Sequence, residues 1–330
     1  MSRHHQRHGM QRIDMHVHLV GNAQGGHGCW LRASAGKRLL YRLMLQQIGL
    51  PLTALQGPLD EPYVDRLLHF IRTSSLDAVV LLAQEEVYDD DGRLMPGRGN
   101  AHVPDARVLA LGRQHPEFLP AISIHPARPD AMEALERGLA GGAVMMKCLP
   151  NCQNIDCSQP RFKPFWTAMA RAGLPLLAHT GGERTLEVLR PEFSDPRILR
   201  LPLECGVTCI AAHAASASGA TDRDYFPELV DMMWQYPQLY ADLSALNLPY
   251  RSRVLRGCLK PELLLRMLHG SDYPVPTQSL WPWLRGLMSY RAMLECAQIG
   301  NPIERDYRLK VAAGFPPETF TRVTNLLRWP

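Results

Sequence analysis

The sequence has no long hydrophobic segment: none of its 330 residues falls in an uninterrupted apolar run of eighteen or more. A helix that crosses a bilayer needs about twenty such residues, so we expect no membrane span. The sequence also has little excess charge, because its formal net charge is only +4 and its Lys and Arg residues are scattered. A nucleic-acid groove requires clustered basic residues, so we expect no nucleic-acid partner.

Signals for export are also missing. Residues 1–11 are basic but contain no apolar core of a secretory signal, so we expect a disordered lead followed by a single domain over residues 12–330. Eight cysteines without an export signal favour free thiols and a cytoplasmic location. Cys148, Cys152 and Cys157 lack a second pair at zinc-site spacing, which favours ordinary loop and core thiols over a structural zinc site.

What the sequence does contain is a regular alternation of apolar segments with amphipathic helical patterns. Eight apolar segments of strand length recur at intervals of about thirty residues. They cover residues 12–19, 78–83, 119–124, 143–147, 174–179, 207–213, 239–242 and 267–272. Eight such units predict a closed (β/α)₈ TIM barrel, a fold of the α/β class. Helical spacing predicts a helical insertion after the first strand and extra C-terminal helices beyond about residue 280.

The first predicted strand carries an H-x-H motif. Apolar and polar residues alternate from residue 13 to residue 19, which predicts that Asp14, His16 and His18 point to one side of the strand. Two imidazoles at i and i+2 can share one ion, since neutral imidazole is the commonest metal ligand. The motif alone is weak evidence, because many histidines only form hydrogen bonds in or near the core.

Polar residues at the ends of other strands strengthen the metal hypothesis. Lys147, His179, His213 and Asp272 each end a different apolar segment. The carboxyl ends of barrel strands meet at one mouth, where the active sites of this fold lie. These residues and the H-x-H pair are therefore expected to converge.

The expected chemistry follows from the residue types. His16, His18 and Asp272 would hold one divalent ion, most simply zinc, and leave a position for a water whose pKa falls to about 7. Asp272 would accept the proton of that water as it attacks a carbonyl or phosphoryl centre. The partner is then a small-molecule substrate.

The strand-end motifs IDMHVH (13–18), LAHTG (177–181) and HGSDYP (269–274) resemble those of the amidohydrolase superfamily. The last two are most similar to those of its branch of aminocarboxymuconate-semialdehyde decarboxylase-like enzymes. Asn325, near the C-terminus, is a further point of resemblance to that branch. The resemblance covers about residues 12–276 and implies a metal-dependent hydrolase on a TIM barrel. For that branch it implies a single ion held by four ligands, with His213 near the bound water. The implied ligands are His16, His18, His179 and Asp272.

Lys147 leaves two forms of the site open. A protonated lysine would repel a cation, so Lys147 is a ligand only if it is carboxylated. The carbamate could then bridge two ions, with His179 and His213 on the second. Otherwise its ammonium pairs with Asp272 or orients an anionic substrate. The sequence CLP at 148–150 departs from the pattern expected of the single-ion branch.

Three functions fit these observations. Hydrolysis of an ester, lactone or amide is our first interpretation, with Asp272 and His213 as catalytic residues. Nonoxidative decarboxylation of an aromatic or unsaturated acid is the alternative, and metal binding without turnover is the third. A homodimer is compatible with the fold. Four residues are candidates for substrate contact, with a loop or solvent-facing role as the alternative for each: His125, Glu183, Arg184 and Arg32.

Overall fold

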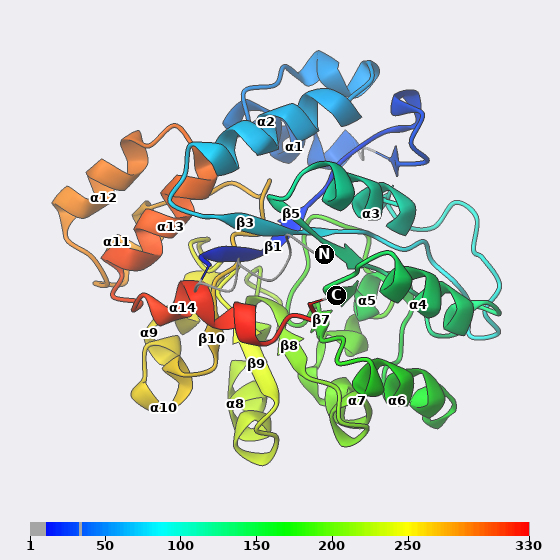
Figure 1. Cartoon of the computed structure of the whole chain (residues 1–330). Coiled ribbons are helices and arrows are strands. Elements are labelled where there is room, and N and C mark those ends of the chain that lie inside the picture. The colour runs from blue at the N-terminus through cyan, green and yellow to red at the C-terminus, as the bar shows by residue number, and fades with distance from the viewer. Residues whose placement is uncertain (1–10, 33–34, 330) are drawn as a thin grey trace, which may run out of the picture.

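Eight parallel strands form the centre of the computed structural model, which describes residues 11–32 and 35–329 (Figure 1). The strands, in sheet order, are β1 (Ile13–His18), β3 (Ala78–Leu82), β5 (Phe118–Ile122), β6 (Met145–Cys148), β7 (Leu176–Ala178), β8 (Cys209–Ala211), β9 (Leu239–Asp242) and β10 (Met267–Leu268). A parallel bridge between Val17 and Tyr273 joins the chain after β10 back to β1. The predicted TIM barrel is confirmed. Apart from Gln11, the predicted disordered lead lies outside the described residues.

Helices surround this barrel (Figure 1). Those between successive strands are α2 (Asp60–Arg72), α3 (Asp105–Gln114), α4 (Ala131–Ala140), α5 (Pro150–Gln153), α6 (Lys163–Arg171), α7 (Arg200–Glu204), α8 (Phe226–Gln235), α9 (Leu255–Cys258) and α10 (Pro261–Leu264). The predicted C-terminal helices are α11 (Leu280–Leu284), α12 (Tyr290–Gln298), α13 (Pro302–Ala312) and α14 (Glu318–Thr321).

The segment after β1 contains the predicted helical insertion, α1 (Arg38–Gln47), followed by a 3-10 turn over Leu52–Gln56. It also contains β2 (Trp30–Leu31), which pairs antiparallel with β4 (Ala101–His102). This small sheet was not expected, because strands of two residues leave no periodic pattern in a sequence. It joins the loops that follow β1 and β3.

Apolar side chains from the strands fill the barrel. They include Ile13, Met15, Val80, Leu82, Met145, Leu177, Ile210 and Leu268. Val323 and Leu327, which follow α14, pack in the same cluster. The backbone N–H of Arg328 donates to the carbonyl of Val144 (3.0 Å), just before β6 begins. The C-terminal segment therefore covers the end of the barrel opposite the mouth.

Strand β1 departs from the predicted strict alternation. Its pairing with β3 shifts register between Asp14 and Val17, as a β-bulge does. Met15 consequently packs inside the barrel, whereas Val17 packs in a separate cluster with residues of α2. The carboxylate of Asp14 accepts hydrogen bonds from the backbone N–H groups of His16 (3.1 Å) and Ser271 (2.9 Å). The prediction that Asp14 points with the two histidines was therefore wrong, since it assumed an unbroken two-residue period.

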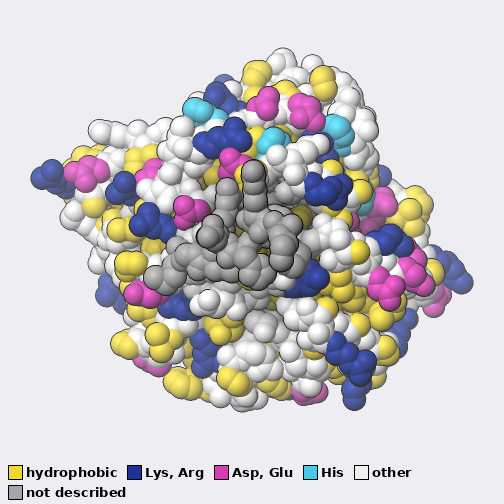
Figure 2. All heavy atoms as spheres, in the orientation of Figure 1, with side chains coloured by type: hydrophobic (Ala, Val, Ile, Leu, Met, Phe, Trp, Pro, Cys, Tyr) yellow, Lys and Arg dark blue, Asp and Glu magenta, His cyan; other side chains and the backbone are white. Residues whose placement is uncertain are grey.

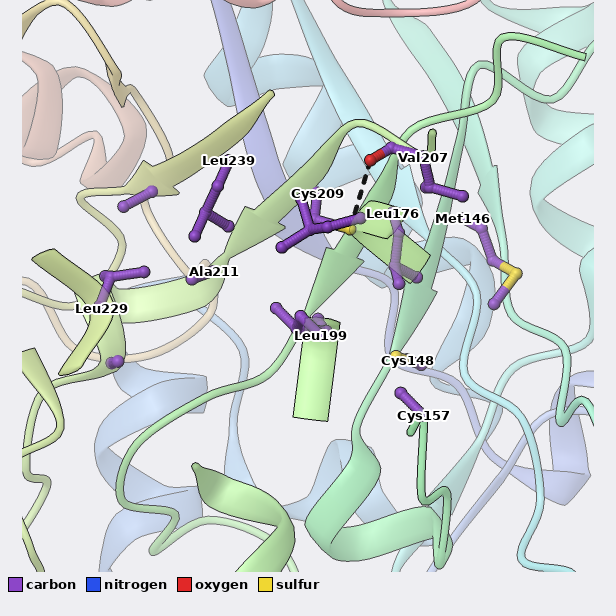
Figure 3. Packing of buried hydrophobic residues seen from close by; sticks show 14 of the residues in the cluster. Met146, Cys148, Cys157, Leu176, Leu199, Val207, Cys209, Ala211, Leu229 and Leu239 are labelled. Atoms are coloured by element: carbon purple, nitrogen blue, oxygen red, sulfur yellow. Dashed lines mark hydrogen bonds between the residues drawn. The ribbon is translucent and has the colours of Figure 1, made fainter. Parts of the chain in front are cut away.

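The eight cysteines are free thiols, and most of them are buried. Cys148, Cys157 and Cys209 lie in the apolar layer between the strands and the surrounding helices (Figure 3). The thiol of Cys209 donates to the carbonyl of Val207 (3.7 Å), and burial raises its pKa well above the usual value. All eight cysteines are free, and no candidate ion-binding group among the described residues includes one. Cys148, Cys152 and Cys157 are all buried, and the interpretation of them as ordinary thiols stays a prediction.

The surface shows no segregation of charge on the face seen in Figure 2, where side chains of both signs are interspersed. Within residues 11–32 and 35–329, every helix is too short or too polar to cross a bilayer. The cytoplasmic location, the absence of a nucleic-acid partner and the homodimer stay predictions.

A buried ion pair within helix α13 is hydrogen-bonded to loops of the barrel. The Lys310 ammonium donates to the Asp306 carboxylate and to the carbonyl of Gly270 (2.6 Å). Asp306 also accepts a hydrogen bond from the side chain of Asn247 (3.0 Å). Both charged side chains are almost fully buried, so neither can exchange its partner for water.

We expect Lys310→Met to lower the free energy of unfolding by about 3–5 kcal/mol, because it leaves the Asp306 carboxylate buried without its counter-charge. Arg308→Ala is the matched control on the same helix, since Arg308 forms a half-exposed ion pair with Glu304 and its loss should cost about 1 kcal/mol or less. Urea unfolding of both variants measures the difference. Equal losses would contradict the structural role given to the buried pair.

Candidate functional site

The predicted ligands gather at the carboxyl ends of the strands. His16 and His18 lie at the end of β1, and Lys147 lies in β6. His179, His213 and Asp272 follow β7, β8 and β10. These six side chains are buried except that of His18, which is 19% exposed. The structure therefore brings together residues that lie more than 250 positions apart in the sequence.

The tightest cluster consists of His16, His18 and Asp272. The Nε2 atoms of the two histidines are 3.3 Å apart. Oδ1 of Asp272 lies 3.3 Å from Nε2 of His16 and 3.2 Å from Nε2 of His18. These three potential ligand atoms lie close enough together to hold one metal ion.

The protonation states suit this role. Burial would raise the pKa of Asp272, but the two neighbouring histidines outweigh it and hold the pKa below its usual range. Burial and the nearby Lys147 lower the pKa of His16 to about 4. At neutral pH the cluster therefore presents an ionised carboxylate and an uncharged imidazole, the forms that bind a cation.

His179 and His213 face each other beside this cluster. Nε2 of His213 lies 3.2 Å from Nδ1 of His179, and Nδ1 of His213 lies 2.8 Å from the hydroxyl of Ser244. Nε2 of His179 is buried without a hydrogen-bond partner, 3.5 Å from Oε2 of Glu183. Burial lowers the pKa of both histidines well below the usual value, so both stay uncharged. The orphaned nitrogen of His179 is a donor atom available to an ion.

Asp242 is a site residue that the sequence reasoning missed. Its carboxylate accepts hydrogen bonds from Nδ1 of His16 (2.7 Å) and from the backbone N–H of His213 (2.7 Å). It also accepts hydrogen bonds from Ser244. Burial would raise its pKa, but His16 and these hydrogen bonds hold the pKa far below its usual range. Asp242 ends the seventh predicted strand, and that position was the signal that could have identified it.

The contact with Asp242 sets the tautomer of His16. The ionised carboxylate accepts a hydrogen bond from Nδ1–H, so the lone pair of His16 lies on Nε2, the atom that faces His18 and Asp272. Asp242 also forms a second candidate ion-binding group with His16 and His213. The Nδ1 atoms of His16 and His213 are already engaged by Asp242 and by Ser244, which favours the cluster with Asp272. The residues present therefore fit a divalent ion.

Three consecutive residues after β8 adopt left-handed backbone conformations: His213 (φ 58°), Ala214 (φ 47°) and Ala215 (φ 53°). Such conformations are costly for residues other than glycine and need support from their surroundings. Asp242 supplies part of this support by accepting a hydrogen bond from the backbone N–H of His213. Arg251, fully buried, donates to the carbonyl of Gly182 (2.6 Å) and contacts that of Ser216 (3.5 Å), which ties the loops after β7 and β8 together.

Lys147 lies at the base of the site. Its Nζ atom is 3.3 Å from Nε2 of His16, and burial lowers its pKa although Asp242 and Asp272 oppose that shift. A lowered pKa favours the uncharged amine, and this is the form that can be converted to a carbamate.

The four predicted substrate residues divide into two groups. Glu183 lines the cavity above the cluster, and its Oε1 accepts a hydrogen bond from the N–H of Leu186 (2.9 Å). The other three do not line that cavity. Arg184 pairs with Asp222 (2.6 Å), and the guanidinium of Arg32 lies 4.2 Å from the ring centroid of Trp30.

His125 is buried and held by loop backbone. Its Nε2 lies 3.3 Å from the carbonyl of Asn154, and its Nδ1 accepts from the N–H of Ala127 (3.1 Å). These contacts are those of a residue that fixes the loop after β5.

A barrel with two histidines on its first strand and a carboxylate after its last defines the class of TIM-barrel proteins with a metal centre at the mouth. The chain belongs to the amidohydrolase family, whose sequence model, Amidohydro_2, matches residues 13–288. This family is metal-dependent and includes decarboxylases as well as hydrolases. No curated protein is similar enough in sequence to count as a relative.

Solved structures share the fold over nearly the whole chain. An uncharacterised TIM-barrel protein from Bordetella bronchiseptica is 20% identical, with a TM-score of 0.59 over 92% of this chain and 99% of its own. A protein from Pseudomonas putida, provisionally described as a 2-pyrone-4,6-dicarboxylic acid hydrolase, is 15% identical (TM-score 0.52; 97% and 95% covered). The 5-carboxyvanillate decarboxylase of Sphingomonas paucimobilis is 10% identical (TM-score 0.51; 98% and 100% covered). At these identities the likeness concerns the fold alone.

We expect Asp242→Asn to weaken metal binding by about 10–100-fold, because an amide can offer its NH₂ group to Nδ1 of His16 and so favour the wrong tautomer. Asp231→Asn, an exposed residue of α8, is the matched control and should bind metal like the wild type. Zinc titration against a chromophoric chelator measures both affinities. A wild-type affinity in folded Asp242→Asn would contradict the assigned role.

Proposed function

We propose that the protein is a metal-dependent hydrolase that cleaves a C–O or C–N bond in a small molecule, such as an ester, lactone or amide. The single observation that carries this proposal is the ionised Asp272 carboxylate, held 3.2–3.3 Å from the imidazoles of His16 and His18 at the base of a cavity. A divalent ion, most simply Zn²⁺, held by His16, His18, His179 and Asp272 would supply Lewis-acid activation of water and of the substrate carbonyl.

Asp272 is the residue placed to move the proton. Its second carboxylate oxygen, Oδ2, is not engaged by the histidines, and Asp272 itself lines the cavity. The carboxylate would accept a proton from the attacking water and return it to the leaving oxygen or nitrogen. A pKa below the usual range keeps it in the basic form at neutral pH.

His213 is the second catalytic candidate. Ser244 engages its Nδ1 atom, so its Nε2 atom is directed to His179 and the cavity. The Ser244 hydroxyl donates to Asp242 and the Ser244 carbonyl lies 3.1 Å from Nδ1 of His213, so Nδ1 carries the ring proton. The unprotonated Nε2 atom can then accept a hydrogen bond from the water and orient it. Asp242 acts through His16 and His213 and is a positioning residue.

A single ion is the simpler form of the proposal. The compact cluster of His16, His18 and Asp272 accounts for one ion without any change to Lys147. A carboxylated Lys147 would allow a second ion with His179 and His213, and two metal equivalents per chain would support that form.

Decarboxylation of an aromatic or unsaturated acid is the second candidate, because a 5-carboxyvanillate decarboxylase has the same fold. The intact carboxylate of Asp272 speaks against a protein that binds metal without turnover.

We expect chelation of the metal to abolish hydrolysis of a responsive substrate and Zn²⁺ to restore it. Asp272→Asn should lower kcat by about 10²–10⁴-fold, the usual cost of losing a general base. Asp65→Asn, an exposed residue of α2, is the control and should retain activity. The activity of each protein is measured on a panel of esters, lactones, amides and aromatic acids, with hydrolysis and CO₂ release followed separately. Release of CO₂ without hydrolysis would overturn the proposal in favour of a lyase.

A further inference from the structure

The cavity above the candidate metal centre has an apolar wall that the inserted segment provides. His18, His179, His213 and Asp272 form its polar base. Helix α1, the 3-10 turn after it and the start of α2 form the opposite wall. The wall residues are Tyr41, Met44, Leu45, Ile48, Leu55 and Leu59. One continuous cavity thus joins reactive groups to an apolar surface.

This wall is held in place by polar contacts with other loops at the mouth. The ammonium of Lys37 donates to the carbonyls of Thr185 and Leu186, both at 2.9 Å. The side chain of Gln47 donates to the carbonyl of Val275 (3.3 Å) and accepts from the N–H of Thr277 (2.8 Å). The wall is therefore formed before a ligand binds, and less free energy is lost in ordering it.

The described lining of the cavity offers no Lys or Arg side chain to a substrate carboxylate. Among the side chains that the structure describes, its lining includes the carboxylates of Glu183 and Asp272 but no Lys or Arg. Three described cations near the mouth are engaged elsewhere: Lys37 binds carbonyls, Arg184 pairs with Asp222, and Arg32 stacks on Trp30. A carboxylate against the apolar wall would lose hydration without gaining a counter-ion.

We propose that the substrate is an uncharged ester, lactone or amide whose alkyl or aryl group lies against the wall formed by α1 and the 3-10 turn. This inference rests on the proposed hydrolase function and specifies its substrate class. The side chains of Gln84 and His102 also line the cavity and can bind a neutral polar group. The reactive carbonyl then lies at the base, beside Asp272.

Paired p-nitrophenyl esters test this class of substrate. Across the butyrate, hexanoate and octanoate esters, kcat/KM should rise by about fourfold for each methylene that the wall buries. The mono-p-nitrophenyl ester of adipic acid has the acyl length of the hexanoate with a terminal carboxylate, and we expect at least a tenfold lower kcat/KM for it. A flat chain-length series, or an adipate ester hydrolysed as well as the hexanoate, would overturn the inference.

Binding measured without turnover separates this inference from the hydrolase proposal. By calorimetry on the metal-loaded protein, octan-1-ol, which has no hydrolysable bond, should bind at least tenfold more tightly than 8-hydroxyoctanoate, its counterpart with a terminal carboxylate. If no ester is hydrolysed but this preference holds, the hydrolase proposal fails, whereas the inference that the cavity prefers uncharged ligands stands. Equal binding of the two alcohols overturns the inference whatever the activity.

A charge placed on the wall should reverse the preference. Met44→Arg introduces a cation on the cavity side of α1, so the hexanoate-to-adipate ratio of kcat/KM should fall at least tenfold. Leu43→Arg is the matched control, because Leu43 lies next to Met44 but is 45% exposed and does not line the cavity. An unchanged ratio in a folded Met44→Arg, or an equal change in both variants, would contradict the proposal. If Met44→Arg does not fold, the wild-type ester series decides.

Discussion

The hydrogen bond between Asp242 and Nδ1 of His16, 2.7 Å long and fully buried, is the interaction on which the site depends. One carboxylate fixes the tautomer of a strand-one histidine, supports the strained backbone at His213 and receives the Ser244 hydroxyl. Its desolvation is costly, and only the complete set of donors offsets that cost. One buried network therefore sets the orientation of His16 in β1 and of His213 after β8.

The sequence predicted the strands and the convergence of ligands well, because both follow from simple periodicities. Buried parallel strands read as short apolar runs, and closure of the barrel brings their ends to one mouth. His16, His18, His179, His213 and Asp272 meet there because each directly ends such a run. The likeness to a known superfamily agreed with this reading, and the family match confirmed it.

Other features could not be read from the sequence. The bulge in β1 lies in its pairing with β3, a strand distant in the sequence, so no local pattern reveals that Asp14 turns away from the histidines. The sequence did not single out Asp242, because a carboxylate at the end of an apolar strand can equally well be an ordinary loop residue. Arg32 and Arg184 were plausible as free charges, yet Arg32 donates to the distant carbonyl of Arg98 and Arg184 pairs with Asp222. The apolar wall likewise arises only when α1 folds over the mouth.

The position of residues 323–327 has a consequence for how the protein forms during synthesis. Val323 and Leu327 pack in the barrel interior beside Ile13 and Met15, so the earliest and latest parts of the described chain share one core. Strand β1 also needs its contact after β10 before the barrel is complete. Until residues 323–327 have been synthesised, Ile13 and Met15 lack part of their apolar packing. The native interior of the barrel is therefore complete only after this late segment is available.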